Sequence, residues 1–136
     1  MRRVRSTAAL CAGALGAAML TGCGGTDTGA CLPAPLELSR TSVEVGLTVI
    51  VSSAAAGCDL GELGSYDLTL TAGMVEQSVG RFDVDADGSF EARVAIPAGA
   101  EPGPAVLSVT GSPYDDCPVL DDGLCTGYAV DLDLTA

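Results

Sequence analysis

Residues 82–97 read FDVDADGSFEARVAIP, and this stretch decides the fold. Apolar residues alternate with charged ones on both sides of an aspartate–glycine pair. A side-chain period of two is typical of strands that bury one face, and an aspartate–glycine pair between two such runs is typical of a tight turn. The stretch therefore predicts a hairpin with a three-residue loop. It would place Val84 opposite Phe90, and Phe82 opposite Ala92.

The same stretch offers an alternative role for its carboxylates. Three aspartates stand at alternate positions before a glycine: Asp83, Asp85 and Asp87. This spacing resembles the start of an EF-hand calcium loop, in which position 12 is a bidentate glutamate. Position 12 is Val94 here, and no flanking helix is predicted. Diagonal ion pairs with Arg81 and Arg93 would account for the carboxylates without a metal, so we predict the hairpin and keep calcium as the alternative.

The same alternation continues outward in both directions. Apolar and polar residues alternate in residues 43–51, 66–72, 105–109 and 128–134, and residues 36–38 could add a short edge strand. Glycine and proline separate these runs, and after the leader no helical stripe extends over three turns. About seven short strands in roughly 100 residues predict an all-β fold, an antiparallel β-sandwich of the immunoglobulin type.

A family resemblance agrees with this fold. An aspartate–glycine turn, a phenylalanine, a strand ending in Pro97 and the Pro102-Gly103 turn before the next strand resemble bacterial Ig-like domains of actinobacterial surface proteins. The close resemblance covers roughly residues 79–111, and a looser one extends back to Val43. It implies surface display, adhesion or spacing, and usually no catalysis. The chain departs from the family in its cysteines and in a long acidic loop, which puts a purely structural role in doubt.

The N-terminus has the pattern of an export signal. Three arginines precede an uncharged, apolar stretch that ends in Leu20-Thr21-Gly22-Cys23. A basic region followed by a short apolar region is typical of a signal peptide, and the apolar stretch is shorter than the ~20 residues that span a bilayer. The last four residues resemble the lipobox of bacterial lipoproteins, in which the cysteine receives the lipid and cleavage occurs before it.

These features predict three parts of the chain. Residues 1–22 would be the lipoprotein signal peptide, residues 23–34 a lipidated tether, and residues 35–136 one domain. Cys23 would hold the protein on the extracytoplasmic face of the bacterial cell membrane. The expected partners are that membrane, through the lipid, and an unidentified envelope or extracellular protein.

The composition excludes several classes of function. After cleavage, three arginines would face 18 acidic residues, a net charge of −15, which disfavours nucleic acid as a partner. The chain has no histidine and no lysine, so it cannot form a Ser-His-Asp triad or a Schiff base. Carboxylates alone would have to do the chemistry, as in some glycosidases. We therefore predict a protein that is not an enzyme and needs no cofactor, with a carboxylate-based hydrolase as a remote alternative.

Four cysteines would remain in the mature chain besides Cys23. An even number in an exported protein predicts two disulfides among Cys31, Cys58, Cys117 and Cys125. Three connectivities are open. Proximity in the chain favours Cys31 with Cys58 and Cys117 with Cys125.

The second of these pairs would close an acidic loop between the last two strands. Its aspartates are Asp115, Asp116, Asp121 and Asp122. In an immunoglobulin-type sandwich, loops at this position can be recognition loops. We take them as candidate binding residues for a cation or a basic partner, the alternative being a solvated surface loop without a specific role.

Overall fold

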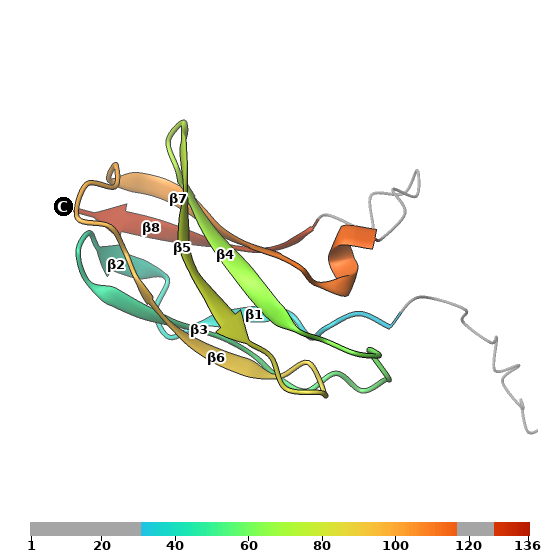
Figure 1. The fold of residues 1–136 in the computed structure, drawn as a ribbon. Helices are drawn as coiled ribbons and strands as arrows, with labels where there is room; N and C mark the ends of the chain where they lie inside the picture. The colour runs from blue at the N-terminus through green and yellow to red at the C-terminus, as the bar shows by residue number, and fades with distance from the viewer. Residues whose placement is uncertain (1–30, 117–126) are drawn as a thin grey trace, which may run out of the picture.

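The computed structural model describes residues 31–116 and 127–136, which form two packed β-sheets (Figure 1). The smaller sheet has the strand order β1-β3-β6, with bounds Leu36–Leu38, Thr48–Ser53 and Phe90–Ala95. The larger sheet has the order β2-β8-β7-β4-β5, with bounds Ser42–Glu44, Tyr128–Thr135, Gly103–Thr110, Ser65–Ala72 and Val75–Asp83. One 3-10 turn, η1, spans Pro113–Asp116. The all-β sandwich predicted from the sequence is confirmed.

Each sheet combines strands that are far apart in the sequence. In the larger sheet β7 lies between β8 and β4, and in the smaller sheet β3 pairs with both β1 and β6. The chain contributes its first segment to both sheets, since β1 pairs with β3 whereas β2 pairs with β8. The β2–β8 pair is parallel, and the other pairs are antiparallel. The described residues thus hold eight strands, one more than the prediction, because one predicted strand is divided.

That divided strand is residues 43–51. Their alternation predicts one strand, but a turn separates β2 from β3 and sends them to different sheets. In this turn the amide of Leu47 donates to the carbonyl of Glu44 over 3.1 Å, and Gly46 has a φ of +84°. A turn with positive φ at its third position favours glycine there. Gly46 was therefore the turn signal within the alternating run.

The predicted hairpin of residues 82–92 is wrong. β5 pairs with β4, so Phe82 lies opposite Tyr66 and not opposite Ala92. β6 pairs with β3 in the other sheet, where Ala92 lies opposite Val51. Residues 84–89 therefore cross from one sheet to the other. The physical reason is that β5 finds its partner across the shorter connection at Gly73 and Met74, and strands joined by two residues pair readily.

The core lies between the sheets, because each strand turns one face inward. The burial of β4 and β6 alternates residue by residue along the strand. The largest fully buried side chains are Tyr66, Leu68, Leu70, Ile96, Leu107, Val43, Val49, Val51 and Val94. In the part of the chain described here, no helix is long and apolar enough to cross a membrane.

The two ends of the sandwich differ in what they carry. We call the end that holds residues 31–35, 54–64, 84–89 and 111–116 the entry end, since the chain enters the domain there (Figure 1). The far end holds the β2–β3 turn, the β4–β5 hairpin tip, residues 96–102 and the C-terminus.

Candidate functional site

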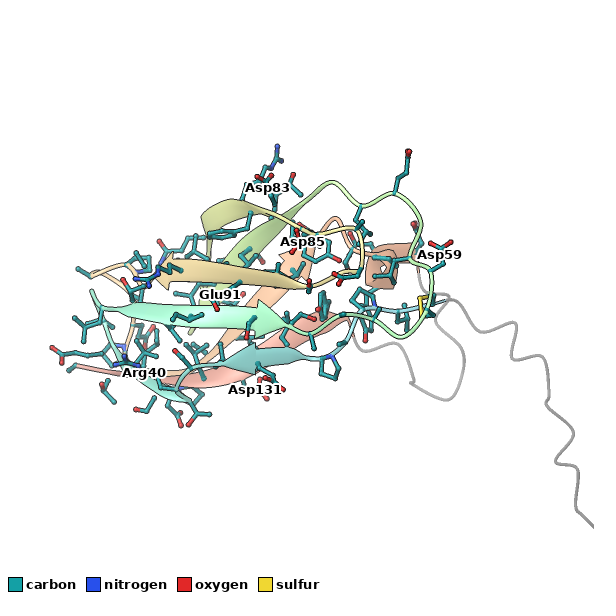
Figure 2. The ribbon with its side chains drawn as sticks, turned by 90° about the horizontal axis from the view of Figure 1, so that it is seen from below. Arg40, Asp59, Asp83, Asp85, Glu91 and Asp131 are labelled. Carbon is teal, nitrogen blue, oxygen red and sulfur yellow. A yellow bond between two sulfur atoms is a disulfide. The ribbon has the colours of Figure 1, made fainter. Side chains whose placement is uncertain are left out.

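A disulfide closes the entry end. The sulfur atoms of Cys31 and Cys58 are bonded, with Cα atoms 5.8 Å apart and the two residues 27 positions apart in the sequence. Figure 2 shows this bond near Asp59, on the β3–β4 connection. The pairing predicted from proximity is therefore present. Cys23, Cys117 and Cys125 lie outside the described residues, so the lipidation site and the second disulfide stay predictions.

An aromatic cluster fills the core beside the disulfide. Tyr66 packs edge-on against Phe90 and Tyr128, with ring centroids 5.5 and 6.0 Å apart. Tyr114 of η1 stacks on Tyr128 at 4.8 Å. The hydroxyl of Tyr128 donates to the carbonyl of Ala34 over 2.7 Å. The cluster thus fastens the chain leading into β1 to the last strand.

Burial governs the acidity of two of these tyrosines. Desolvation raises the pKa of Tyr128 to about 12. The pKa of Tyr66 is raised by desolvation and, to a smaller extent, by the negative charge of Asp115. Among the described residues, the hydroxyl of Tyr66 has no hydrogen-bond partner. Both groups are neutral near pH 7, so the cluster serves packing.

The calcium candidates Asp83, Asp85 and Asp87 do not form a cage in this structure. Asp87 Oδ1 accepts hydrogen bonds from the backbone amide and the Oγ of Ser89, over 2.9 and 2.6 Å. These bonds, with the Ser89 hydroxyl first, lower the pKa of Asp87. Within residues 31–116 and 127–136, no three histidine, cysteine or acidic side chains are grouped so that they could hold a metal ion. Asp87 shapes the crossover between the sheets.

The acidic loop is described only in its first part. Asp115 Oδ2 accepts a hydrogen bond from the backbone amide of Gly111 over 2.6 Å, which closes the turn that leads into η1. Asp116 is exposed at the end of η1. Asp121 and Asp122 lie outside the described residues. Asp115 therefore has a local structural role, and the recognition role of the loop stays a prediction.

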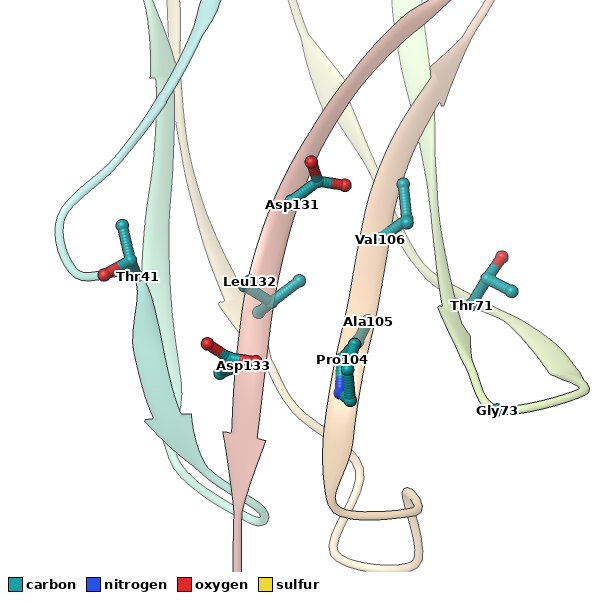
Figure 3. Close-up of a pocket in the computed structure, with 9 residues that line it drawn as sticks. All are labelled: Thr41, Thr71, Gly73, Pro104, Ala105, Val106, Asp131, Leu132 and Asp133. Atoms are coloured by element: carbon teal, nitrogen blue, oxygen red, sulfur yellow. The ribbon is translucent and has the colours of Figure 1, made fainter.

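A groove lies on the outer face of the larger sheet, toward the far end (Figure 3). Its volume is about 590 Å³. We call it the β7–β8 groove; its lining residues are Thr41, Thr71, Gly73, Pro104, Ala105, Val106, Asp131, Leu132 and Asp133. Thr41 and Thr71 stand at its two sides in Figure 3, and the aspartates project from β8 between them.

The groove has a physical origin in the sheet. β4 stays paired with β7 only as far as Ala72 opposite Ala105, and the chain then turns away at Gly73. The next residue of β7 is Pro104, which has no amide hydrogen to offer a neighbouring strand. β8 continues beside β7, with Asp133 opposite Pro104. The sheet therefore loses a strand on one side where β7 and β8 extend further.

The groove offers groups for recognition. Asp131 and Asp133 supply carboxylates, the two threonines supply hydroxyls, and Val106 and Pro104 supply apolar surface. Sequence reasoning placed both aspartates on the polar face of the last strand but did not single them out. The available signal was a pair of carboxylates at alternate positions, opposite a proline near the start of the preceding strand.

A bidentate ion pair lies on the same outer face, nearer the entry end. Arg81 Nε donates to Asp67 Oδ1 over 2.7 Å and Nη2 donates to Oδ2 over 2.8 Å, because the register of β4 and β5 places these residues opposite each other. The hydrogen bonds from Arg81 lower the pKa of Asp67. Arg81 thus pairs across β4 and β5, and not diagonally with the residues of β6 as predicted.

A comparison of the chain with protein-family models finds no match, and a comparison with curated proteins finds none either.

Proposed function

We propose that the protein is a lipid-anchored, non-enzymatic interaction module on the extracytoplasmic face of a bacterial cell membrane. Its single domain would bind another envelope or extracellular protein. The observation that carries the proposal is Leu20-Thr21-Gly22-Cys23 behind a basic and then apolar leader. A signal peptide followed by a lipid-accepting cysteine converts a soluble domain into an anchored one.

The disulfide supports the exported location. Disulfides form and persist in oxidising compartments and are rare in the cytosol of most cells. Cys31 and Cys58 form such a bond near the start of the domain. Cys31 follows Cys23 by eight positions, and eight residues reach at most roughly 29 Å. The entry end would therefore lie near the membrane surface and the far end away from it.

The chemistry of the chain supports a role in binding. It lacks histidine and lysine, which excludes the commonest general bases and nucleophile partners. The carboxylates of the β7–β8 groove are exposed on an open sheet face, without the water-excluded cleft that would tune a carboxylate pair for acid–base work. Exposed carboxylates of this kind can recognise a cationic group on another molecule without taking part in a reaction.

The anchor is tested with Cys23→Ser in the full chain, in a host that processes lipoproteins. We expect the wild type in the membrane fraction, with an acylated N-terminal cysteine by mass spectrometry. The variant should lose the acyl mass. It should also lose its stable membrane association, because each acyl CH₂ buried in the bilayer contributes ~0.8 kcal/mol to membrane binding and the contributions of several chains add up. Cys11→Ser, within the leader, is the matched control and should remain lipidated. An unmodified Cys23 in the wild type would contradict the proposal.

A further inference from the structure

We propose that the β7–β8 groove is the docking surface for a basic segment of a partner protein. This inference rests on the proposed function, since it names the surface and the class of partner that an interaction module needs. Three observations carry it: the carboxylates in the groove, the apolar rim formed by the adjoining hairpin tip, and the position at the far end of the domain.

The carboxylates are spaced for an extended partner. Asp131 and Asp133 both lie on the outer face of β8 and are exposed. Residues two apart on a strand are separated by roughly 6.5–7 Å. Basic side chains at alternate positions of an extended segment have the same spacing. Asp131 lies opposite Val106, which lies opposite Thr71, so an apolar strip and a row of hydroxyls run beside the carboxylates.

The charges around the groove are mostly negative. Both charged residues that line the groove are aspartates. Glu76 lies opposite Thr71, and Glu101 lies against Gly73 at the rim. On this face Arg81 is held by Asp67, and Arg40 precedes Thr41 at one side of the groove. The potential in the groove therefore favours a cationic partner, and this attraction weakens with salt.

An apolar rim adjoins the groove at the β4–β5 hairpin. Met74 is fully exposed and Val75 is 57% exposed, directly after the lining residue Gly73. Neither side chain belongs to the core, so their apolar surface is available for contact with another molecule. Methionine adapts to differently shaped partners. The partner segment should accordingly have apolar residues among its basic ones.

The observations select a basic protein segment over other occupants. A second copy of the chain would bring its own excess of negative charge to an acidic face, which opposes association. Anionic lipid head groups would be repelled for the same reason. With the anchor at the entry end, the groove would lie away from the membrane, where a protein partner has access.

The probe is a capped heptapeptide of alternating arginine and valine, titrated into the full chain as an exporting host processes it, with ¹⁵N labelling for NMR. We expect saturable shifts in the amides of Val106, Asp131, Asp133 and Met74. The double variant Asp131→Asn/Asp133→Asn should weaken binding by about tenfold or more. Added salt should weaken binding to the wild type more than to this variant.

The matched control is Glu37→Gln/Glu91→Gln. It removes the same number of charges from the outer face of the other sheet, where both glutamates lie opposite Ser52. It should leave the affinity within about twofold of the wild type. The same peptide with glutamate in place of arginine should not bind.

Each contrary result overturns the proposal. These results are no saturable binding by about 1 mM peptide, equal weakening by both double variants, shifts centred on Asp115 and Asp116, or a dimer of the chain that occupies this face. None of them bears on the Cys23→Ser test. Loss of the groove proposal would therefore leave the anchored module standing, and loss of the anchor would leave the binding data intact.

Discussion

Tyr128 connects the two ends of the chain through one hydroxyl. It donates to the carbonyl of Ala34, and Ser53 Oγ donates to the same carbonyl over 2.8 Å. A carbonyl oxygen has two lone pairs, so both donors can be accommodated. The side chain of Tyr128 is 4% exposed, and this burial is what raises its pKa to about 12. Its proton therefore links the stability of the fold to pH.

The consequence appears in alkaline solution. The folded state keeps the Tyr128 proton to a higher pH than the unfolded state, whose tyrosine has a pKa near 10. The stabilising contribution is complete below about pH 10 and is lost as pH rises toward about 12, at ~1.4 kcal/mol per pH unit. The raised pKa of Tyr66 acts in the same direction. Urea unfolding at several pH values should show this decline in the free energy of unfolding.

Tyr128→Phe removes the titrating proton together with the hydrogen bond to Ala34. It should cost about 1 kcal/mol near pH 7 and make the decline above pH 10 shallower. Ser53→Ala removes the other donor to Ala34 without a titrating group. It should lower stability near pH 7 and keep the slope of the wild type. An equal slope in Tyr128→Phe and the wild type would contradict the role of this residue.

At the scale of elements, alternation identifies strands better than it identifies their ends or partners. Residues 66–72, 105–109 and 128–134 were correctly predicted, because the apolar positions of each strand face the core and are buried or, at Val130, partly buried. Residues 43–51 were not, because the alternation passes unbroken through the turn at Gly46. The sheet to which each strand belongs depends on contacts across the core, and a period of two holds no information about them. This is why the β5–β6 hairpin was predicted wrongly.

A prediction at this scale concerns Gly111, which lies at the junction of β7 with η1. Gly111 has a φ of +93°, and a Cβ added there would lie 3.0 Å from the backbone carbonyl oxygen of Ser65. Gly111→Ala should lower the free energy of unfolding by about 1–2 kcal/mol, because both the backbone conformation and the contact are unfavourable for alanine. Thermal and urea unfolding would measure it.

Gly57→Ala is the matched control, since a Cβ at that position meets nothing within 4 Å and the backbone has no positive φ. It should be neutral or slightly stabilising. If the two variants had the same stability, the close approach at Gly111 would have no energetic weight.

At the scale of the whole molecule, the sandwich and the Cys31–Cys58 pairing could be predicted, since both follow from local spacing. The β7–β8 groove could not. It arises where β4 leaves the sheet beside Pro104, and that point depends on the length of β4 relative to β7. The aspartates that line it were visible in the sequence only as polar positions of a strand. The placement of Asp121, Asp122, Cys117 and Cys125 stays a prediction.

The disulfide should be the largest single contribution to stability that can be removed without touching the core. In the chain-entropy model, a loop of this length is worth about 3–4 kcal/mol. We expect Cys31→Ala/Cys58→Ala to lower the free energy of unfolding by that amount in urea. Mild reductant, at a concentration that peptide mapping shows to cleave this bond, should lower the free energy of unfolding of the wild type toward that of the variant. A variant as stable as the wild type would contradict this account.

The Cys31–Cys58 disulfide also determines how far the domain can extend under a pulling force. A force applied between an anchored N-terminus and a partner at the far end enters the domain at Cys31 and passes through the sulfur atoms to Cys58. The 26 residues between them cannot be drawn out as extended chain while the bond is intact, so roughly 90 Å of chain is held back. β1, β2 and β3 lie within this segment and are shielded from tension. Reduction of the disulfide would release that length of chain. The redox conditions of the envelope would therefore set how far the domain extends under load.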